Sequence, residues 1–177
     1  KENMWVAMIG CVADFHIHYF SDEFVKKYPD LFLEKIKDPA QALFETKVGL
    51  LVKIISFNLK GKTTDVRKSL NCLVKINEPY EILNKTNKEG EYLWGRYEEI
   101  NSLYKKLLDN ALKQKADENF LIYVYPDNGL AVSSELSNEL QYKFPNKYII
   151  VGRAKDDAVV LSVRNYSKPV RDILLKA

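Results

Sequence analysis

Hydrophobic positions open the chain as one block: residues 5–13 carry no charge, and Asp14 follows them. An apolar run of this length bounded by polar residues predicts a buried element, either a central strand or a core helix. The acid at its end has two interpretations. It caps or turns the chain, which is a common use of Asp, or it belongs to the kind of ligand or metal site that open α/β proteins place at strand ends.

Between residues 22 and 115 the apolar positions recur mostly at three- and four-residue steps, which predicts an almost wholly helical region. Asp38 and Pro39 are typical of the N-cap and first position of a helix, whose apolar stripe continues to Leu59. Thr64 and Pro79 predict the starts of two further helices. The clearest helical periodicity covers residues 89–115.

After residue 117 the pattern changes to short β-rich runs separated by turn residues, which predicts a small α/β module. We expect the order strand, helix, strand, strand, helix, over residues 120–125, 133–142, 148–151 and 159–163 and from Pro169 onward. Polar residues cluster at 115–118, and we expect the domain boundary there.

Composition and charge narrow the class of protein. The 177 residues are 46% hydrophobic and 29% charged, which is ordinary for a soluble globular protein. No apolar stretch is long enough for a membrane span. Cys11 and Cys72 lie in apolar contexts, which predicts buried free thiols in a reducing cytoplasm. Because the chain starts at Lys1 and enters an apolar block at once, we expect it to be part of a longer protein.

Positive charge concentrates at the C-terminal end. Residues 153–177 hold six basic and three acidic side chains, a surplus of three that equals the net charge of the whole chain, +3. A cationic end suits a phosphate-bearing ligand. A solvated surface with a chance asymmetry of charge explains the same count.

Three candidate metal ligands follow the first apolar run. If residues 14–18 are extended, then Asp14, His16 and His18 lie on one face, and a carboxylate with two imidazoles can bind a divalent metal. The same alternation is what any half-exposed strand requires, so the histidines are also explained without a metal.

Candidate anion-binding groups lie in the C-terminal module. Arg164 ends an apolar strand, and arginine suits bidentate phosphate recognition; a strand-end arginine reaching solvent is the alternative. Ser133, Ser134 and Asn138 lie at a predicted helix start, where hydroxyls and free amide N–H groups form an anion site. Plain N-capping by the serines is the alternative that this pattern favours.

Taken in order, these segments resemble the DHH phosphoesterase family, and within it the RecJ-like proteins of archaeal type. The segment WVAMIGCVAD at residues 5–14 is similar to the one in which that family places its last metal-binding aspartate. The segments SSELSNEL, FPNKYIIVGR, VVLSVRN and VRDILLKA resemble the DHH-associated C-terminal domain. The resemblance covers most of the chain and is strongest at residues 4–14 and 130–177.

The resemblance implies an α/β fold: residues 1–116 as the end of a parallel-sheet DHH domain with a helical linker, and residues 117–177 as an incomplete substrate-binding domain. It implies a cytoplasmic metal-dependent hydrolase, an exonuclease or nucleotide phosphodiesterase with two Mn²⁺ or Mg²⁺ ions. Asp14 would be the catalytic metal ligand, and Arg164 would bind the phosphate of single-stranded nucleic acid or a small nucleotide. The family's Asp-His-His signature is absent, so this chain alone would be inactive and would need an N-terminal portion. One alternative is a non-catalytic RecJ-like scaffold that binds replication proteins, and another is an α/β binding module unrelated to this family.

Overall fold

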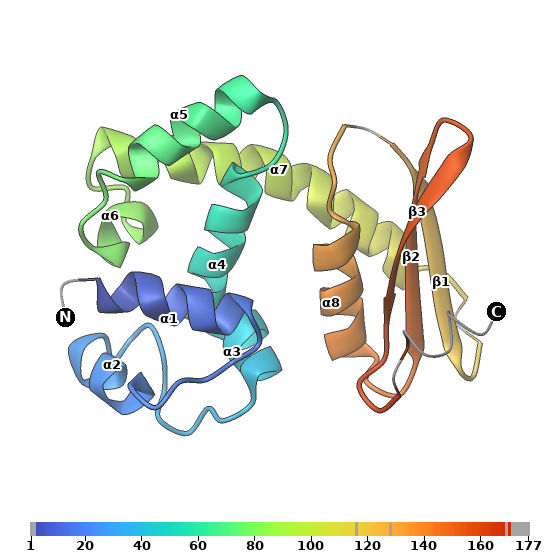
Figure 1. Ribbon diagram of the computed structural model, residues 1–177, viewed down its shortest axis with the longest axis horizontal. Helices are drawn as coiled ribbons and strands as arrows, with labels where there is room; N and C mark the ends of the chain where they lie inside the picture. Colours follow the sequence, from blue (N-terminus) through green and yellow to red (C-terminus); the bar gives the residue numbers. More distant parts are fainter. Residues whose placement is uncertain (1–2, 116, 128, 169, 171–177) are drawn as a thin grey trace. The chain divides into compact units, whose positions relative to one another are not determined.

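The computed structural model describes residues 3–115, 117–127, 129–168 and 170. The chain divides into two compact units, residues 1–100 and residues 101–177 (Figure 1). The expected mixed α/β class is confirmed, with a helical region followed by a small mixed sheet. No helix in the described part of the chain is both long and apolar enough to cross a membrane.

All regular secondary structure in the described residues of the N-terminal unit is helical. The apolar run is a helix, so the core-helix alternative is the one that the structure adopts; Trp5, Met8, Ile9 and Val12 make its buried face. The sheet expected at the start of the chain does not form, since no residue from 3 to 115 lies in a strand. The helices are α1 (Met4–Ala13), α2 (Ser21–Lys27), α3 (Pro39–Glu45), α4 (Lys47–Asn58), α5 (Thr63–Leu73), α6 (Pro79–Leu83) and α7 (Lys88–Leu112), the last of which continues into the second unit.

Helix starts explain much of this local order. Asp38 caps α3 as expected, because its carboxylate accepts a hydrogen bond of 3.0 Å from the Ala40 N–H. The single helix expected up to Leu59 is divided at Thr46, whose backbone is extended. The Thr46 hydroxyl accepts from the Gly49 N–H at 3.0 Å and so caps α4. The division lets α3 and α4 pack against each other.

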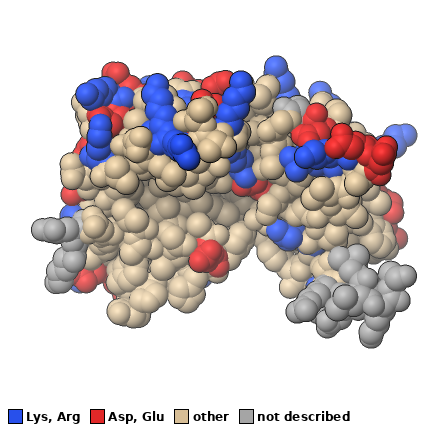
Figure 2. Space-filling model, turned by 45° about the horizontal axis from the view of Figure 1, so that its top comes forward, with Lys and Arg blue, Asp and Glu red and all other residues tan. Residues whose placement is uncertain are grey.

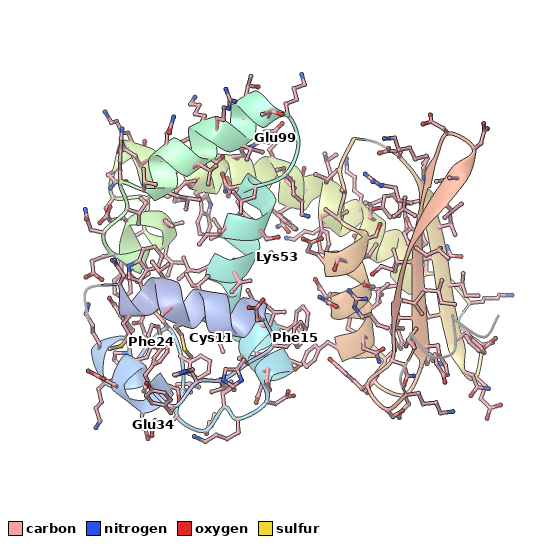
Figure 3. All side chains as sticks on the ribbon, viewed as in Figure 1. Cys11, Phe15, Phe24, Glu34, Lys53 and Glu99 are labelled. Carbon is pink, nitrogen blue, oxygen red and sulfur yellow. The ribbon has the colours of Figure 1, made fainter. Side chains whose placement is uncertain are left out.

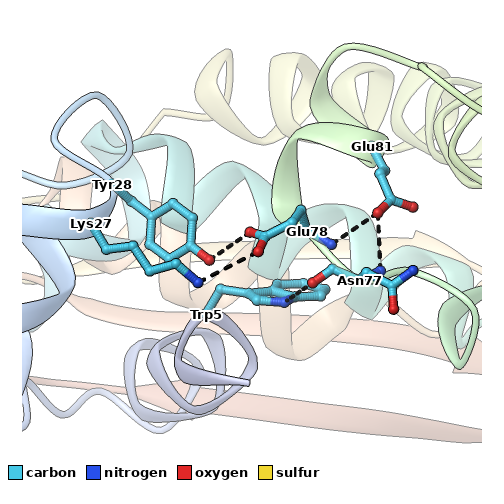
Figure 4. A network of polar contacts seen from close by, with 6 residues as sticks. All are labelled: Trp5, Lys27, Tyr28, Asn77, Glu78 and Glu81. Atoms are coloured by element: carbon cyan, nitrogen blue, oxygen red, sulfur yellow. Dashed lines mark hydrogen bonds and ion pairs between the residues drawn. The ribbon is translucent and has the colours of Figure 1, made fainter. Parts of the chain in front are cut away.

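A polar network joins α1, α2 and the start of α6 (Figure 4). The Trp5 indole N–H donates to the Asn77 carbonyl at 3.0 Å, and the Tyr28 hydroxyl donates to the Glu78 carboxylate at 2.6 Å. The backbone N–H groups of Asn77 and Glu78 donate to the Glu81 carboxylate. Burial and the hydrogen bond to Glu78 raise the pKa of Tyr28, so this contact is made by the neutral phenol.

The C-terminal unit is a three-stranded sheet with one helix. Its elements are β1 (Phe120–Pro126), α8 (Ser133–Lys143), β2 (Tyr148–Lys155) and β3 (Ala158–Arg164). β1 and β2 are parallel, with α8 as the crossover, and β3 pairs antiparallel with β2. Asp156 supplies the positive φ of the hairpin turn, at 52°. This order confirms the expected strand, helix, strand, strand; the last helix expected from Pro169 lies outside the described residues, apart from Val170.

α8 packs on one face of this sheet and positions the candidate site. Leu136 and Leu140 of α8 are fully buried, as are Ile149 and Val151 of β2. The antiparallel register pairs Ile149 with Arg164 and Val151 with Ser162. Because directly paired residues point to the same side of a sheet, the Arg164 and Ser162 side chains lie on the face that α8 covers.

Candidate functional site

Arg164 and two of the predicted α8 residues form one cluster. The Arg164 Nε donates to Asn138 Oδ1 at 2.8 Å, and Nη2 donates to the Ser134 hydroxyl at 3.1 Å. Nη1 donates to the carbonyl oxygen of Val163 at 3.0 Å. The fold therefore joins residues that lie 26 and 30 positions apart in the sequence.

The Arg164 guanidinium keeps both donors and charge available. It carries five N–H groups, of which these three contacts use three. The remaining two lie one on each Nη atom, which is the terminal fork that recognises two oxygens of one anion. All three acceptors are neutral, and no carboxylate among the described residues is paired with this guanidinium. The site can therefore bind a carboxylate or a phosphate in bidentate fashion.

The two serines at the start of α8 do not cap it. The N-cap is Val132, and no side chain caps this end of the helix, so the prediction of plain N-capping was wrong. Ser134 instead accepts from Arg164. The Ser133 hydroxyl lies 2.9 Å from the Tyr125 hydroxyl, so Ser133 holds α8 to β1 and is not part of the Arg164 cluster.

Ser137 is a site residue that the sequence did not single out. It is fully buried, and its hydroxyl donates to the Ser134 carbonyl at 2.9 Å. Its one proton is used there, so Ser162 donates to it across 2.8 Å. This bond fixes β3 against α8 two residues before Arg164. The sequence could have identified Ser137, because it is a polar residue between Leu136 and Leu140 on the buried stripe of α8.

Asp14 lies at the end of α1 in the N-terminal unit. Its backbone N–H donates to the carbonyls of Gly10 and Cys11, both at 3.1 Å, and the chain then turns at Phe15, which has a φ of 54° (Figure 3). The Asp14 side chain is exposed and has no partner among the described residues. A carboxylate at a helix C-terminus faces the negative end of the helix dipole, at a cost of about 0.3–1 kcal/mol. Local structure thus gives this acid no stabilising role.

The histidines do not join Asp14 on one face. That expectation required an extended chain, whereas Asp14 ends a helix and Phe15 has a positive φ. His16 and His18 meet edge to face, 5.8 Å between ring centroids, and His18 also packs near Tyr19 and Phe20. Within the described part of the chain, no three His, Cys, Asp or Glu side chains are placed to hold a metal ion.

Both cysteines are free thiols, and both are half-buried. Cys11 lies on α1 and Cys72 on α5. The expectation of free thiols is therefore confirmed, while their burial is less complete than the apolar context predicted.

Comparison of this sequence with known protein-family models finds no match, and comparison of its fold with solved structures also finds none.

Proposed function

We propose that this chain is part of a DHH-type metal-dependent phosphoesterase, and that its C-terminal unit binds the phosphate of a single-stranded nucleic acid or a small nucleotide. The observation that carries the proposal is the Arg164 guanidinium, held by neutral acceptors with one unused N–H on each Nη atom. A guanidinium oriented in this way, with its charge not neutralised, matches two oxygens of a phosphate group.

Asp14 is the proposed metal ligand in the N-terminal unit. Its carboxylate is exposed, unpartnered among the described residues and placed at the unfavourable end of a helix, and a bound Mn²⁺ or Mg²⁺ would offset that cost. Two such ions would activate a water and stabilise the leaving oxygen. One carboxylate does not make this site, and the described residues supply no further ligand set, so the proposal requires ligands from elsewhere in the complete protein.

The phosphate contact is tested by nucleotide binding to the chain. Arg164→Gln removes the charge and the fork, which costs about 1.5–3 kcal/mol, or roughly tenfold to a hundredfold in affinity. Arg164→Lys keeps the charge but loses the fork, so an intermediate affinity is expected. Arg153→Gln is the matched control, since Arg153 lies in the same unit and is paired with Asp127 at 3.7 Å. Wild-type affinity in Arg164→Gln, measured by fluorescence anisotropy, would contradict the proposal.

The catalytic part is tested in the complete protein. Hydrolysis of single-stranded oligonucleotides with Mn²⁺ is expected, and Asp14→Asn is expected to abolish it while nucleotide binding by the C-terminal unit persists. Nucleotide binding without any hydrolysis by the wild-type protein would contradict the enzymatic proposal and favour the scaffold alternative.

A further inference from the structure

A second cationic surface lies on the N-terminal unit, along α5. Residues 60–75 hold five basic side chains and a single acid, Asp65. Lys62, Arg67 and Lys68 are exposed. Figure 2 shows lysine and arginine side chains, with some acidic side chains among them, over the upper part of this unit, where α5 and α7 lie in Figure 1.

The first turns of α7 add to this surface. The Lys68 ammonium lies 4.3 Å from the centre of the Tyr92 ring, a cation–π contact that holds α5 beside α7. Lys88 precedes Tyr92 by one helical turn and so lies on the same face of α7.

Two acids of this region are paired, while Glu91, about one turn after Lys88 on α7, is exposed and adds a negative charge there. Asp65 lies 3.6 Å from the Arg96 guanidinium, and Glu89 lies 3.3 Å from the Lys75 ammonium. Lys62, Arg67, Lys68 and Lys88 have no acidic partner among the residues that the structure describes. We call these four the α5 cationic surface. From Lys62 to Lys68 the helix rises about 9 Å and turns through more than one revolution, so the charges are spread too widely for one small anion and suit a chain of phosphates better.

We propose that the α5 cationic surface binds the phosphate backbone of a single-stranded nucleic acid. The ligand class rests on the proposed function, whereas the residues are independent of Arg164. Lysine and arginine contacts of this kind release condensed counterions, so they add affinity that falls steeply with salt and does not depend on base sequence.

The test is fluorescence anisotropy of the full chain over a series of NaCl concentrations. It uses two labelled probes, an oligothymidylate of twenty nucleotides and a mononucleotide. The double variant Lys68→Gln/Lys88→Gln is expected to bind the oligothymidylate roughly tenfold more weakly. Its salt dependence is expected to flatten by about 1.4 in log–log slope, since each lost contact to a single strand removes about 0.7. Lys62→Gln/Arg67→Gln is a second variant with the same expected loss.

Lys26→Gln/Lys35→Gln is the matched control, because both lysines are exposed in the same unit and the charge change is identical. Mononucleotide binding is expected to be unchanged in every lysine variant and weakened only by Arg164→Gln. Loss of oligothymidylate affinity in the control equal to that in both test variants would overturn the inference. So would equal affinity for a duplex of the same length, or binding to anionic phosphatidylserine vesicles without binding to oligothymidylate. If the proposed function fails, the affinity for the mononucleotide will instead be the same in Arg164→Gln as in the wild-type chain.

Discussion

Asn58 is the residue on which the packing of three helices in the N-terminal unit converges. It is fully buried at the end of α4. Its Nδ2 donates to the carbonyls of Ile54 at 2.9 Å and Leu93 at 2.8 Å, and its Oδ1 accepts from the Ser69 hydroxyl at 2.9 Å. One amide thus joins α4 to α5 and α7, and the hydrogen bonds offset the cost of burying it.

Replacing Asn58 by leucine should destabilise the protein by about 3 kcal/mol. The substitution leaves the Ser69 hydroxyl and the Leu93 carbonyl buried without these partners, and each unsatisfied group costs about 1–3 kcal/mol. Asn71→Leu is the control, since Asn71 is exposed on α5 and should change the free energy of unfolding by less than about 0.5 kcal/mol. Urea unfolding followed by tryptophan fluorescence measures both, and equal midpoints would contradict the role given to Asn58.

Residue types in the sequence predicted which side chains are candidates for the site, but only the structure shows which residues these side chains contact. Arginine at a strand end and serines at a helix start were visible in the sequence, and Arg164 with Ser134 and Asn138 does form a cluster. The capping role failed because α8 begins earlier than predicted: Val132 is the N-cap, and Ser133 and Ser134 are the first two residues of the helix. Local preference cannot show that β3 ends beside α8.

At the scale of elements, the packing of α3 against α4 depends on Gly49. A Cβ built on Gly49 would lie 1.9 Å from the Leu43 carbonyl oxygen, a distance at which backbone must move. The glycine therefore permits two helices separated only by Thr46 to approach closely. Gly95, inside α7, has no heavy atom within 4 Å of the same built position, so its missing side chain serves no contact.

Alanine at these two glycines should give opposite results. Gly49→Ala is expected to destabilise the protein by about 3 kcal/mol through the clash with Leu43. Gly95→Ala is expected to stabilise it by about 0.5–1 kcal/mol, because alanine is the better helix former in an open position. Thermal unfolding by circular dichroism separates them; a Gly49→Ala melting temperature at or above the wild-type value would show that α3 and α4 do not approach as described.

Hydrophobic periodicity predicted most of the helices and strands, but it could not decide whether the first element is a helix or a strand. In α5, α7 and α8 polar residues separate the apolar ones and reveal the helical period, and the strands stand out as short β-rich runs between turn residues. In α1 nearly every residue from Trp5 to Val12 is apolar, so a spacing of 2 and a spacing of 3.6 fit equally well. Only the burial of Trp5, Met8, Ile9 and Val12 shows the helical choice.

At the scale of the whole molecule, α7 supplies core residues to both units. Leu93, Tyr97 and Ile100 are buried in the N-terminal unit, and Tyr104, Leu108 and Ala111 are buried in the C-terminal unit. The Tyr104 hydroxyl donates to the Glu139 carboxylate of α8 at 2.7 Å, and burial raises the pKa of this phenol. The two compact units divide after Ile100, inside α7, because the apolar stripe of this helix packs against different elements before and after that residue.

Two separate cores predict two separable unfolding transitions. Both tryptophans, Trp5 and Trp94, lie in the N-terminal unit, so tryptophan fluorescence reports that unit alone, whereas far-ultraviolet circular dichroism reports both. Leu140→Ala removes a fully buried side chain of α8 and should cost the C-terminal unit about 2–5 kcal/mol. The circular dichroism transition of the variant should begin at lower urea while the fluorescence midpoint stays at the wild-type value.

Val74→Ala is the control, because Val74 is 81% exposed and should move neither signal. Equal shifts of both signals in Leu140→Ala would mean that the two units unfold as one, and that α7 couples their cores rather than merely supplying each.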